Sequence, residues 1–293
     1  MSLARYAGVL DSVRGIGWPA LRRVRSAVPG PHVSRVRGTT AEFVEYRPYR
    51  QGDDPRKIDW KLVGRTDRVY IRVSQERTIL PTMLVLDASA SMAFPLATQG
   101  KWEMARQLAV GLAAVARHRG DPVGLALAGV QGSRVIAPRT RKTVLEEMMH
   151  LLERAPEGEV PLAPTATDAM RHGARVVLIT DFLGDAEALL AAGKTFAAAG
   201  GELYAIHVVD RGELDPDPKK LLLSDPERPE IRRPMSPPAR AAYIRRFGEW
   251  RAQLARDWRA VGAVYTMVVP GDEQWRQVIR RITAPQGAAR RTG

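Results

Sequence analysis

After Pro81 the chain alternates between short apolar runs and longer amphipathic stretches, and this alternation constrains the fold more than any other feature. The runs at 83–86, 175–180 and 203–208 have the length and apolar character of buried strands. Residues 101–119 instead carry apolar side chains at helical spacing. Such alternation predicts an α/β fold, with a doubly wound, mostly parallel sheet and helices on both faces. Further strands are expected at 123–128, 133–137 and 263–269, and further helices at 140–152 (capped by Thr140), 186–199, 239–260 and 274–282.

The first apolar run ends in Asp87, Ser89 and Ser91, three oxygen-bearing residues at alternate positions. Ligands of open α/β sheets bind beyond the carboxyl ends of the strands, where these side chains are expected. A carboxylate with two hydroxyls suits Mg²⁺ or Mn²⁺ better than zinc. The alternative is a loop whose side chains only satisfy nearby backbone N–H groups. A phosphoryl-accepting nucleophile is disfavoured, because Ser89 stands where a second acid is expected.

Charge and cysteine content limit the classes of partner. The chain has no cysteine, which excludes disulfides and thiolate metal sites and fits a cytoplasmic location. Its net charge of +13 is concentrated at the two ends, with 16 Lys/Arg against 8 Asp/Glu in residues 1–80 and 11 against 4 in residues 239–293. A basic surface can bind nucleic acid, and such binding would weaken steeply with salt. No nucleic-acid motif accompanies the charge, so we expect no nucleic-acid partner.

The same patterns suggest three segments. Residues 1–33 read as a basic helical segment without the apolar core of a signal peptide, and no window of the chain is apolar enough to span a bilayer. Residues 34–80 contain two candidate strands, 42–46 and 69–73, which are expected to pair as an antiparallel β arm. Residues 81–293 form the α/β domain, and the Pro-rich, charged region near 211–238 is expected to be a hairpin insertion.

Two sequence blocks carry a resemblance to a known family. The first is Gly52-Asp53-Asp54-Pro55-Arg56 followed by Ile58-Asp59-Trp60, and the second is the Val-Leu-Asp-Ala-Ser-Ala-Ser-Met run around Asp87. Together they resemble the bacterial domain of unknown function 58 family, whose members look like von Willebrand factor A (vWA) domains preceded by an arm. The resemblance covers the chain from about residue 34 to its C-terminus.

The resemblance implies a non-catalytic adaptor that binds proteins through a metal-ion-dependent adhesion site. In this sequence the metal ligands would be Asp87, Ser89, Ser91 and Asp181, the last of which follows the strand at 175–180. The cofactor would be Mg²⁺ or Mn²⁺, and a partner carboxylate would complete the coordination. The resemblance also implies a MoxR-type AAA+ ATPase, or its client, as the protein partner, in maturation or assembly of other proteins.

The family's threonine ligand has two candidate positions here. Thr167 lies 14 residues before Asp181, which leaves room for only about two helical turns before the strand. Aligning residues 156–162 with the family's loop fits the length better and places Val160 at the threonine position. Valine cannot coordinate a metal, so the site is expected to lack one ligand. Mg²⁺ retains several waters, so this loss weakens binding without abolishing it.

The arm carries its own cluster of charged residues. They are interpreted as an ion-pair and hydrogen-bond network that fastens the arm to the sheet, with Trp60 as its apolar anchor. A second metal cluster is the alternative. If the main site has decayed, the protein would be a metal-free scaffold that binds its partners through this arm. The residues concerned are Arg47, Asp53, Asp54, Arg56, Asp59 and Trp60.

Overall fold

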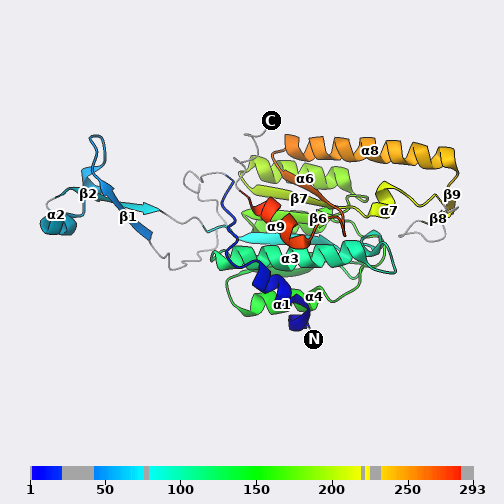
Figure 1. Cartoon of the computed structure of the whole chain (residues 1–293), viewed down its shortest axis with the longest axis horizontal. Helices are drawn as coiled ribbons and strands as arrows, with labels where there is room; N and C mark the ends of the chain where they lie inside the picture. Colours follow the sequence, from blue (N-terminus) through cyan, green and yellow to red (C-terminus); the bar gives the residue numbers. More distant parts are fainter. Residues whose placement is uncertain are drawn as a thin grey trace. The chain divides into compact units, whose positions relative to one another are not determined.

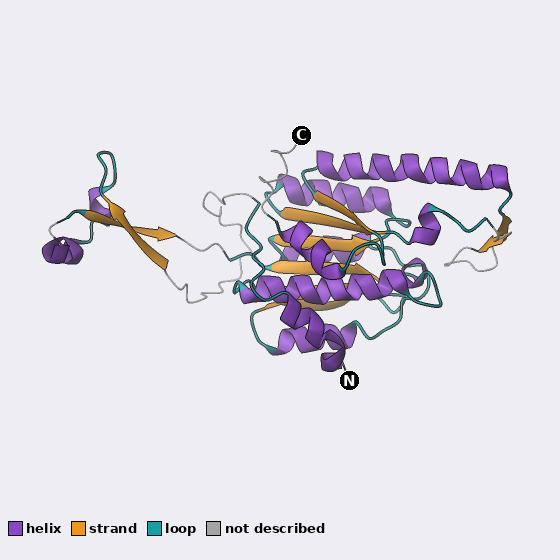
Figure 2. Ribbon diagram, viewed as in Figure 1, coloured by secondary structure: helices purple, strands orange, loops and turns teal. Residues whose placement is uncertain are grey.

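The computed structural model describes residues 2–21, 43–66, 68–75, 79–218, 222–224 and 232–284. The chain divides into two compact units (Figures 1 and 2). The main unit comprises Met1–Leu21 and Leu80–Gly293, and the arm unit comprises Arg22–Ile79.

A six-stranded sheet forms the centre of the main unit, in the order β10-β7-β6-β3-β4-β5. Only β5 is antiparallel to its neighbour; the other pairs are parallel. In chain order this is the doubly wound arrangement 3-2-1-4-5-6, in which the chain winds outward from β3 in both directions. The expected α/β class, with a doubly wound and mostly parallel sheet, is therefore confirmed. The strands are β3 (Thr82–Asp87), β4 (Val123–Ala128), β5 (Arg134–Arg139), β6 (Arg175–Thr180), β7 (Glu202–Val208) and β10 (Val264–Val268).

Helices cover both faces of this sheet because its central strands are apolar on both sides. Alternate residues of β3 enter different cores: Leu84 and Leu86 pack in one cluster, whereas Met83 and Val85 pack in the other. The first cluster includes helices α1 (Ser2–Ser12), α3 (Gly100–His118), α4 (Thr143–Leu151) and α9 (Trp275–Thr283). The second includes α5 (Ala163–His172), α6 (Ala186–Ala198) and α8 (Pro237–Ala260).

Three details of the main unit differ from the sequence-based expectations. Helix α1 packs against α3 and α4, so the N-terminal helix is part of the main unit. Thr140 does not cap α4, because β5 extends to Arg139 and the helix starts at Thr143 with Lys142 as its N-cap. Helix α5 was not among the expected helices, but it occupies the room that the alignment of residues 156–162 left before the strand at 175–180.

Arg175 holds the amino-terminal end of the sheet to the start of the chain. Its side chain is fully buried and lies 3.0 Å from Glu202 and 3.7 Å from Asp121. Its guanidinium also lies 4.3 Å from the ring centre of Trp18, in a cation–π contact. Glu202 in turn accepts a hydrogen bond from the backbone N–H of Leu21. This buried charge cluster is at the opposite end of the strands from Asp87.

The arm unit is built on the expected antiparallel pair. Strand β1 (Phe43–Pro48) pairs with β2 (Tyr70–Gln75), and a 3₁₀ turn η1 (Pro55–Lys57) and helix α2 (Trp60–Thr66) lie between them in sequence. Arg47 makes a two-pronged contact with Asp53, with N–O distances of 2.8 and 2.6 Å. This ion pair, together with the backbone N–H of Arg50, holds the pKa of Asp53 below its usual value.

Two further acidic residues of the arm, Asp54 and Asp59, serve as local caps. Asp54 accepts a hydrogen bond from the backbone N–H of Arg56 at the start of η1. Asp59 caps α2 and also accepts a hydrogen bond from the Tyr46 hydroxyl. The Trp60 side chain is 69% exposed, so it is not buried within the arm, and its role in fastening the arm to the sheet stays a prediction. As the first residue of α2, it lies on a short helix with no buried residues.

The region after β7 contains the expected hairpin. Helix α7 (Arg211–Leu214) comes first, and then β8 (Leu222–Ser224) pairs antiparallel with β9 (Arg232–Pro234). Residues 225–231, between these two strands in sequence, lie outside the described residues. Among the helices that the structure describes, none combines the length and apolar character needed to cross a bilayer.

Candidate functional site

The candidate site lies where the winding of the sheet reverses. Strands β3 and β6 are neighbours and run parallel, so Asp87, the last residue of β3, and Asp181, which follows β6, lie at the same end of adjacent strands. The next strands in the chain lie to opposite sides of this pair, β4 beyond β3 and β7 beyond β6. In doubly wound sheets this switch point is where ligands bind. The fold therefore brings together the two carboxylates that the sequence analysis selected.

Asp87 is buried and firmly held. One carboxylate oxygen accepts a hydrogen bond from the backbone N–H of Ser89 at 2.9 Å, and the other accepts one from the Thr180 hydroxyl at 2.6 Å. Burial, together with the nearby charge of Asp181, raises the pKa of Asp87 to about 6. The Thr180 hydroxyl also accepts a hydrogen bond from the backbone N–H of Phe182. A single hydroxyl thus links Asp87, at the end of β3, to the loop that follows β6. Phe182 itself has a positive φ of 58°.

The hydroxyls of Ser89 and Ser91 lie side by side at the start of the 3₁₀ turn η2 (Ala90–Ala93). Both residues are buried, and their Oγ atoms are 3.0 Å apart. Two ligands at adjacent corners of an octahedron with metal–oxygen distances of about 2.1 Å would be separated by about 3.0 Å. The pair therefore has the spacing of two Mg²⁺ ligands as well as that of a hydrogen bond.

Asp181 is paired with a buried lysine that the sequence analysis did not select. The ammonium of Lys101, in the first turn of α3, lies 2.7 Å from Asp181 and 2.7 Å from Glu213 of α7, and it is fully buried. Burial acts to raise the pKa of Asp181, but Lys101 and the Ser91 hydroxyl hold it below its usual value. The pKa of Glu213 is raised by burial, which Lys101 only partly offsets. One cation thus serves two buried carboxylates.

Val160 lies in the loop before α5 and lines a cavity beside the site. The cavity has a volume of about 20 Å³ for the centre of a water-sized sphere, and Asp87, Ser89 and Thr180 line it as well. This space is enough for about one water molecule. Thr167 instead lies inside α5, where its hydroxyl donates to the carbonyl of Ala163.

The donor set fits a hard divalent cation in part. Two hydroxyls with octahedral spacing and the carboxylate of Asp87 are suitable oxygen donors, and waters would complete the sphere. Asp181 is already paired with an ammonium, so it favours a nearby cation through charge rather than through a free oxygen. No group of three or more His, Cys, Asp or Glu side chains within the described ranges is arranged to hold a metal, the arm's acidic residues included. The hydroxyls of Ser89 and Ser91 and the carboxylate of Asp87 are therefore compatible with Mg²⁺ or Mn²⁺.

His207 of β7 packs against residues next to the site. It pairs in register with Thr180, and its ring packs edge-on against Phe182 at a centroid distance of 5.5 Å. Its Nδ1 lies 2.6 Å from the Tyr265 hydroxyl. Burial lowers the pKa of His207 to about 3; the nearby Asp181 acts in the opposite direction, and the positive charges of Lys101 and Arg251 add to the lowering. The imidazole is therefore neutral at physiological pH.

This buried imidazole predicts a pH-dependent loss of stability. Its folded pKa lies below the unfolded value of about 6.5. The neutral imidazole therefore makes its full contribution to the free energy of unfolding above pH 6.5. This contribution is lost as the pH falls toward 3, by up to about 1.4 kcal/mol per pH unit. We expect His207→Asn to flatten the decline in the free energy of unfolding between pH 6.5 and 4, measured by urea denaturation. The exposed His172→Asn is the control, and an equal effect of both substitutions would contradict the assignment.

Exposed apolar side chains occur around the carboxyl ends of the strands. Leu96 lies in the loop after η2, Val130 follows β4 and Leu183 follows β6, with exposed fractions of 78%, 49% and 48%. The described part of the main unit has only one other large exposed hydrophobic residue, Val135 on the edge strand β5. Exposed apolar side chains that gather at one end of a domain are typical of protein-binding surfaces.

Comparisons with known proteins identify the family. Residues 45–253 match the model of the family described as "Protein of unknown function DUF58". The uncharacterized protein Rv1480 of Mycobacterium tuberculosis is 28% identical over 272 residues, which cover 90% of this chain and 85% of the relative. Similar solved structures include BatB of Bacteroides thetaiotaomicron, with 17% identity, coverage of 69% of this chain and 96% of that chain, and a TM-score of 0.45. They also include an aerotolerance-related membrane protein of Bacteroides fragilis, with 18% identity, coverage of 70% of this chain and 96% of that chain, and a TM-score of 0.47. The chain belongs to the DUF58 family.

Proposed function

We propose that this DUF58 family member is a non-catalytic adaptor that binds a partner protein at the loops around Asp87 and Asp181, in the cytoplasm. The observation that carries the proposal is the position of these oxygen-bearing side chains at the switch point of the sheet. The exposed side chains of Leu96, Val130 and Leu183 at the same end of the sheet support a protein as the ligand.

The proposal includes a divalent cation, Mg²⁺ or Mn²⁺, held by the hydroxyls of Ser89 and Ser91 beside Asp87. When bound, the cation would supply a positive charge that attracts a carboxylate of the partner. Asp87 and Asp181 contribute negative charge close to this position, and Lys101 offsets part of it. Val160 offers no ligand, so water would take that place.

A MoxR-type AAA+ ATPase, or a client of that ATPase, is the proposed partner. This part of the proposal rests on the family resemblance carried by the Gly52–Arg56 and Ile58–Trp60 blocks and the Asp87 loop. A non-catalytic role agrees with the chemistry of the site. Both oxygens of the Asp87 carboxylate already accept hydrogen bonds, and the hydroxyls of Ser89 and Ser91 lie within hydrogen-bond distance of each other.

The test is binding of the purified MoxR-type ATPase from the same organism to the immobilised chain, at constant Mg²⁺ and ATP. We expect Ser89→Ala/Ser91→Ala to weaken binding at least tenfold, because both proposed cation ligands are lost. Substitution is preferable to chelation, since a chelator also strips Mg²⁺ from the ATPase. Ser12→Ala removes an exposed hydroxyl on α1 and is the matched control. Unchanged binding by the double variant would argue against the cation-dependent adaptor.

A metal-free scaffold that binds through the arm is the second candidate. The arm exposes Trp60, Tyr46 and Val69, with exposed fractions of 69%, 45% and 42%. Aromatic side chains are enriched at the centres of protein interfaces. In this case Trp60→Ala would abolish binding of the same ATPase, whereas Ser89→Ala/Ser91→Ala would leave it intact.

A further inference from the structure

A second cavity adjoins the candidate site on the β4 side. It has a volume of about 340 Å³, which is within the usual range of ligand pockets. Its wall is formed by the turn between β4 and β5 and by the segment that follows α4, residues 154–157. Ala88, which separates Asp87 from Ser89, also lines it. The pocket thus shares a loop with the candidate cation site.

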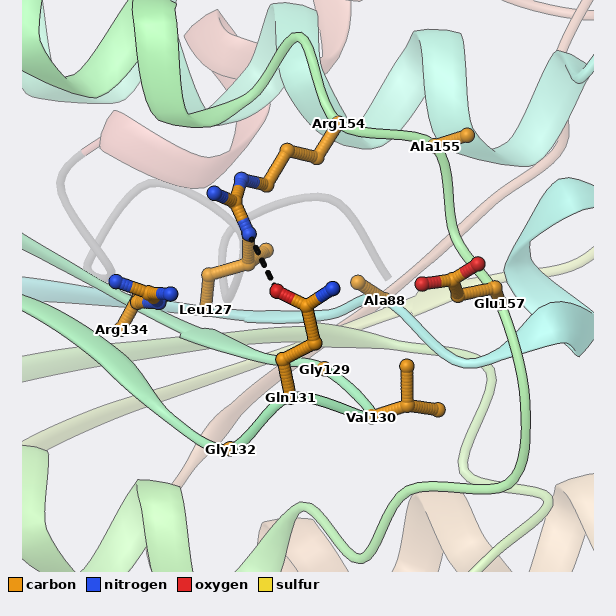
Figure 3. A pocket seen from close by; sticks show the side chains of 10 residues that line it. All are labelled: Ala88, Leu127, Gly129, Val130, Gln131, Gly132, Arg134, Arg154, Ala155 and Glu157. Atoms are coloured by element: carbon orange, nitrogen blue, oxygen red, sulfur yellow. Dashed lines mark hydrogen bonds between the residues drawn. The ribbon is translucent and has the colours of Figure 1, made fainter.

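Two arginines give one side of this pocket a positive charge. Arg134 and Arg154 extend along the same side, and Gln131 lies between Arg154 and the middle of the pocket (Figure 3). Arg154 donates a hydrogen bond to the Gln131 side-chain oxygen at 3.3 Å. Within the described part of the chain, neither arginine forms a salt bridge. Two guanidinium groups without a carboxylate partner form a potential anion site.

The backbone of the pocket is held in place by hydrogen bonds. The N–H of Ala88 donates to the carbonyl of Ala128, and the carbonyl of Ala88 accepts from the N–H of Glu157. The N–H of Gly132 donates to the carbonyl of Gly129, which closes the turn between β4 and β5. Gly132 has a positive φ of 91°, a conformation that glycine adopts without strain. The backbone around the pocket is therefore fixed by the protein's own hydrogen bonds.

We propose that this pocket binds a carboxylate side chain, Asp or Glu, of the partner polypeptide. Each guanidinium of Arg134 and Arg154 presents a fork of N–H groups that matches a carboxylate. The exposed side chain of Val130 at the rim offers an apolar contact to the neighbouring part of the same segment. This proposal deepens the proposed function, on which it rests, by naming the chemistry of the partner segment.

Glu157 makes the pocket selective among anions. Its carboxylate lies across the pocket from the two arginines (Figure 3). The two arginines would also attract a phosphate, but a phosphate would leave Glu157 facing a second anion. A polypeptide segment can also place a backbone N–H or a basic side chain toward Glu157. The charge pattern therefore favours an acidic peptide over a phosphate.

The test uses nuclear magnetic resonance with the full chain and small probes in place of the partner. The probes are N-acetyl-glutamate N-methylamide, its uncharged glutamine analogue and inorganic phosphate. We expect the glutamate probe to shift the amide signals of Gly129, Gln131 and Gly132 with a dissociation constant in the millimolar range. Arg134→Gln/Arg154→Gln should weaken this binding at least fivefold, and Glu157→Gln should strengthen it.

Controls separate this proposal from the proposed function. Arg141→Gln changes the same charge on an exposed arginine beyond the far end of β5, and it should bind the probe like the wild type. Ser89→Ala/Ser91→Ala should also bind it normally, because the pocket does not use the cation. Equal shifts with the glutamine analogue, tighter binding of phosphate, or no effect of the double arginine variant would each overturn the proposal.

Discussion

Replacing Lys101 with methionine is expected to lower the free energy of unfolding by about 3–5 kcal/mol, the usual cost of removing one partner from a buried ion pair. The Lys101 ammonium is fully buried between Asp181 and Glu213, whose side chains are only 3% and 15% exposed. Methionine keeps much of the volume of the side chain but leaves two carboxylates facing each other without a cation. They must then be protonated, hydrated or separated.

The measurement is urea denaturation at pH 7, supported by thermal melting, where a shift on the order of 10 °C is expected for a chain of this size. Lys194→Met, on the exposed face of α6, is the matched control and should change stability by less than about 0.5 kcal/mol. In addition, Lys101→Met/Asp181→Asn/Glu213→Gln should be less destabilised than the single substitution, because no uncompensated charge remains.

Near-equal stability of Lys101→Met and the wild type would show that the three side chains are not a buried ion-paired group. The same conclusion would follow if the triple variant lost as much stability as the sum of its single substitutions. The strands around the site would remain, but the source of the positive charge beside Asp181 would have to be reassigned.

The sheet could be predicted from sequence because its strands are buried on both faces. Burial of residues 82–87 and 175–180 requires continuous apolar runs, and such runs are visible without knowledge of what they pack against. The positions of Asp87 and Asp181 follow, because each comes directly after a run and parallel strands end at the same edge. The antiparallel pairing of β1 with β2 was predictable for a related reason, since neither strand fits the βα alternation.

The charge partners could not be predicted, because they come from distant parts of the chain. Lys101 and Glu213 are 80 and 32 residues from Asp181, and Glu213 lies in a Pro-rich, charged region that resembles a surface insertion. A signal was nonetheless present. A lysine in the first turn of a helix opposes the helix dipole, which suggests that another interaction compensates for it.

Trp60 and the start of α5 show two further limits of sequence analysis. The charges around Trp60 do not reveal that it lies exposed on a short helix with no buried residues. The start of α5 is fixed by Asp185, whose carboxylate accepts hydrogen bonds from the backbone N–H groups of Leu162 and Ala163. A capping residue more than 20 positions downstream leaves no local pattern to detect.

The proposed cation site predicts a second large effect, on the binding of Mn²⁺. The wild type should bind one Mn²⁺ at Ser89 and Ser91, and Ser89→Ala/Ser91→Ala should weaken this binding at least tenfold. Lys101→Met should strengthen it at least tenfold. Unit charges 4 Å apart interact by about 4 kcal/mol at an effective dielectric constant of 20, whereas tenfold in affinity needs only about 1.4 kcal/mol.

Titration of Mn²⁺ followed by electron paramagnetic resonance tests the account most directly, because bound Mn²⁺ loses the sharp signal of the free ion. The measurement is made well below the melting temperature of each variant, with Ser12→Ala as the control. One site in the wild type and in Ser12→Ala that is lost in Ser89→Ala/Ser91→Ala is the predicted result. Absence of binding to the wild type at millimolar Mn²⁺, or equal binding by the double variant, would contradict a cation site at the end of β3.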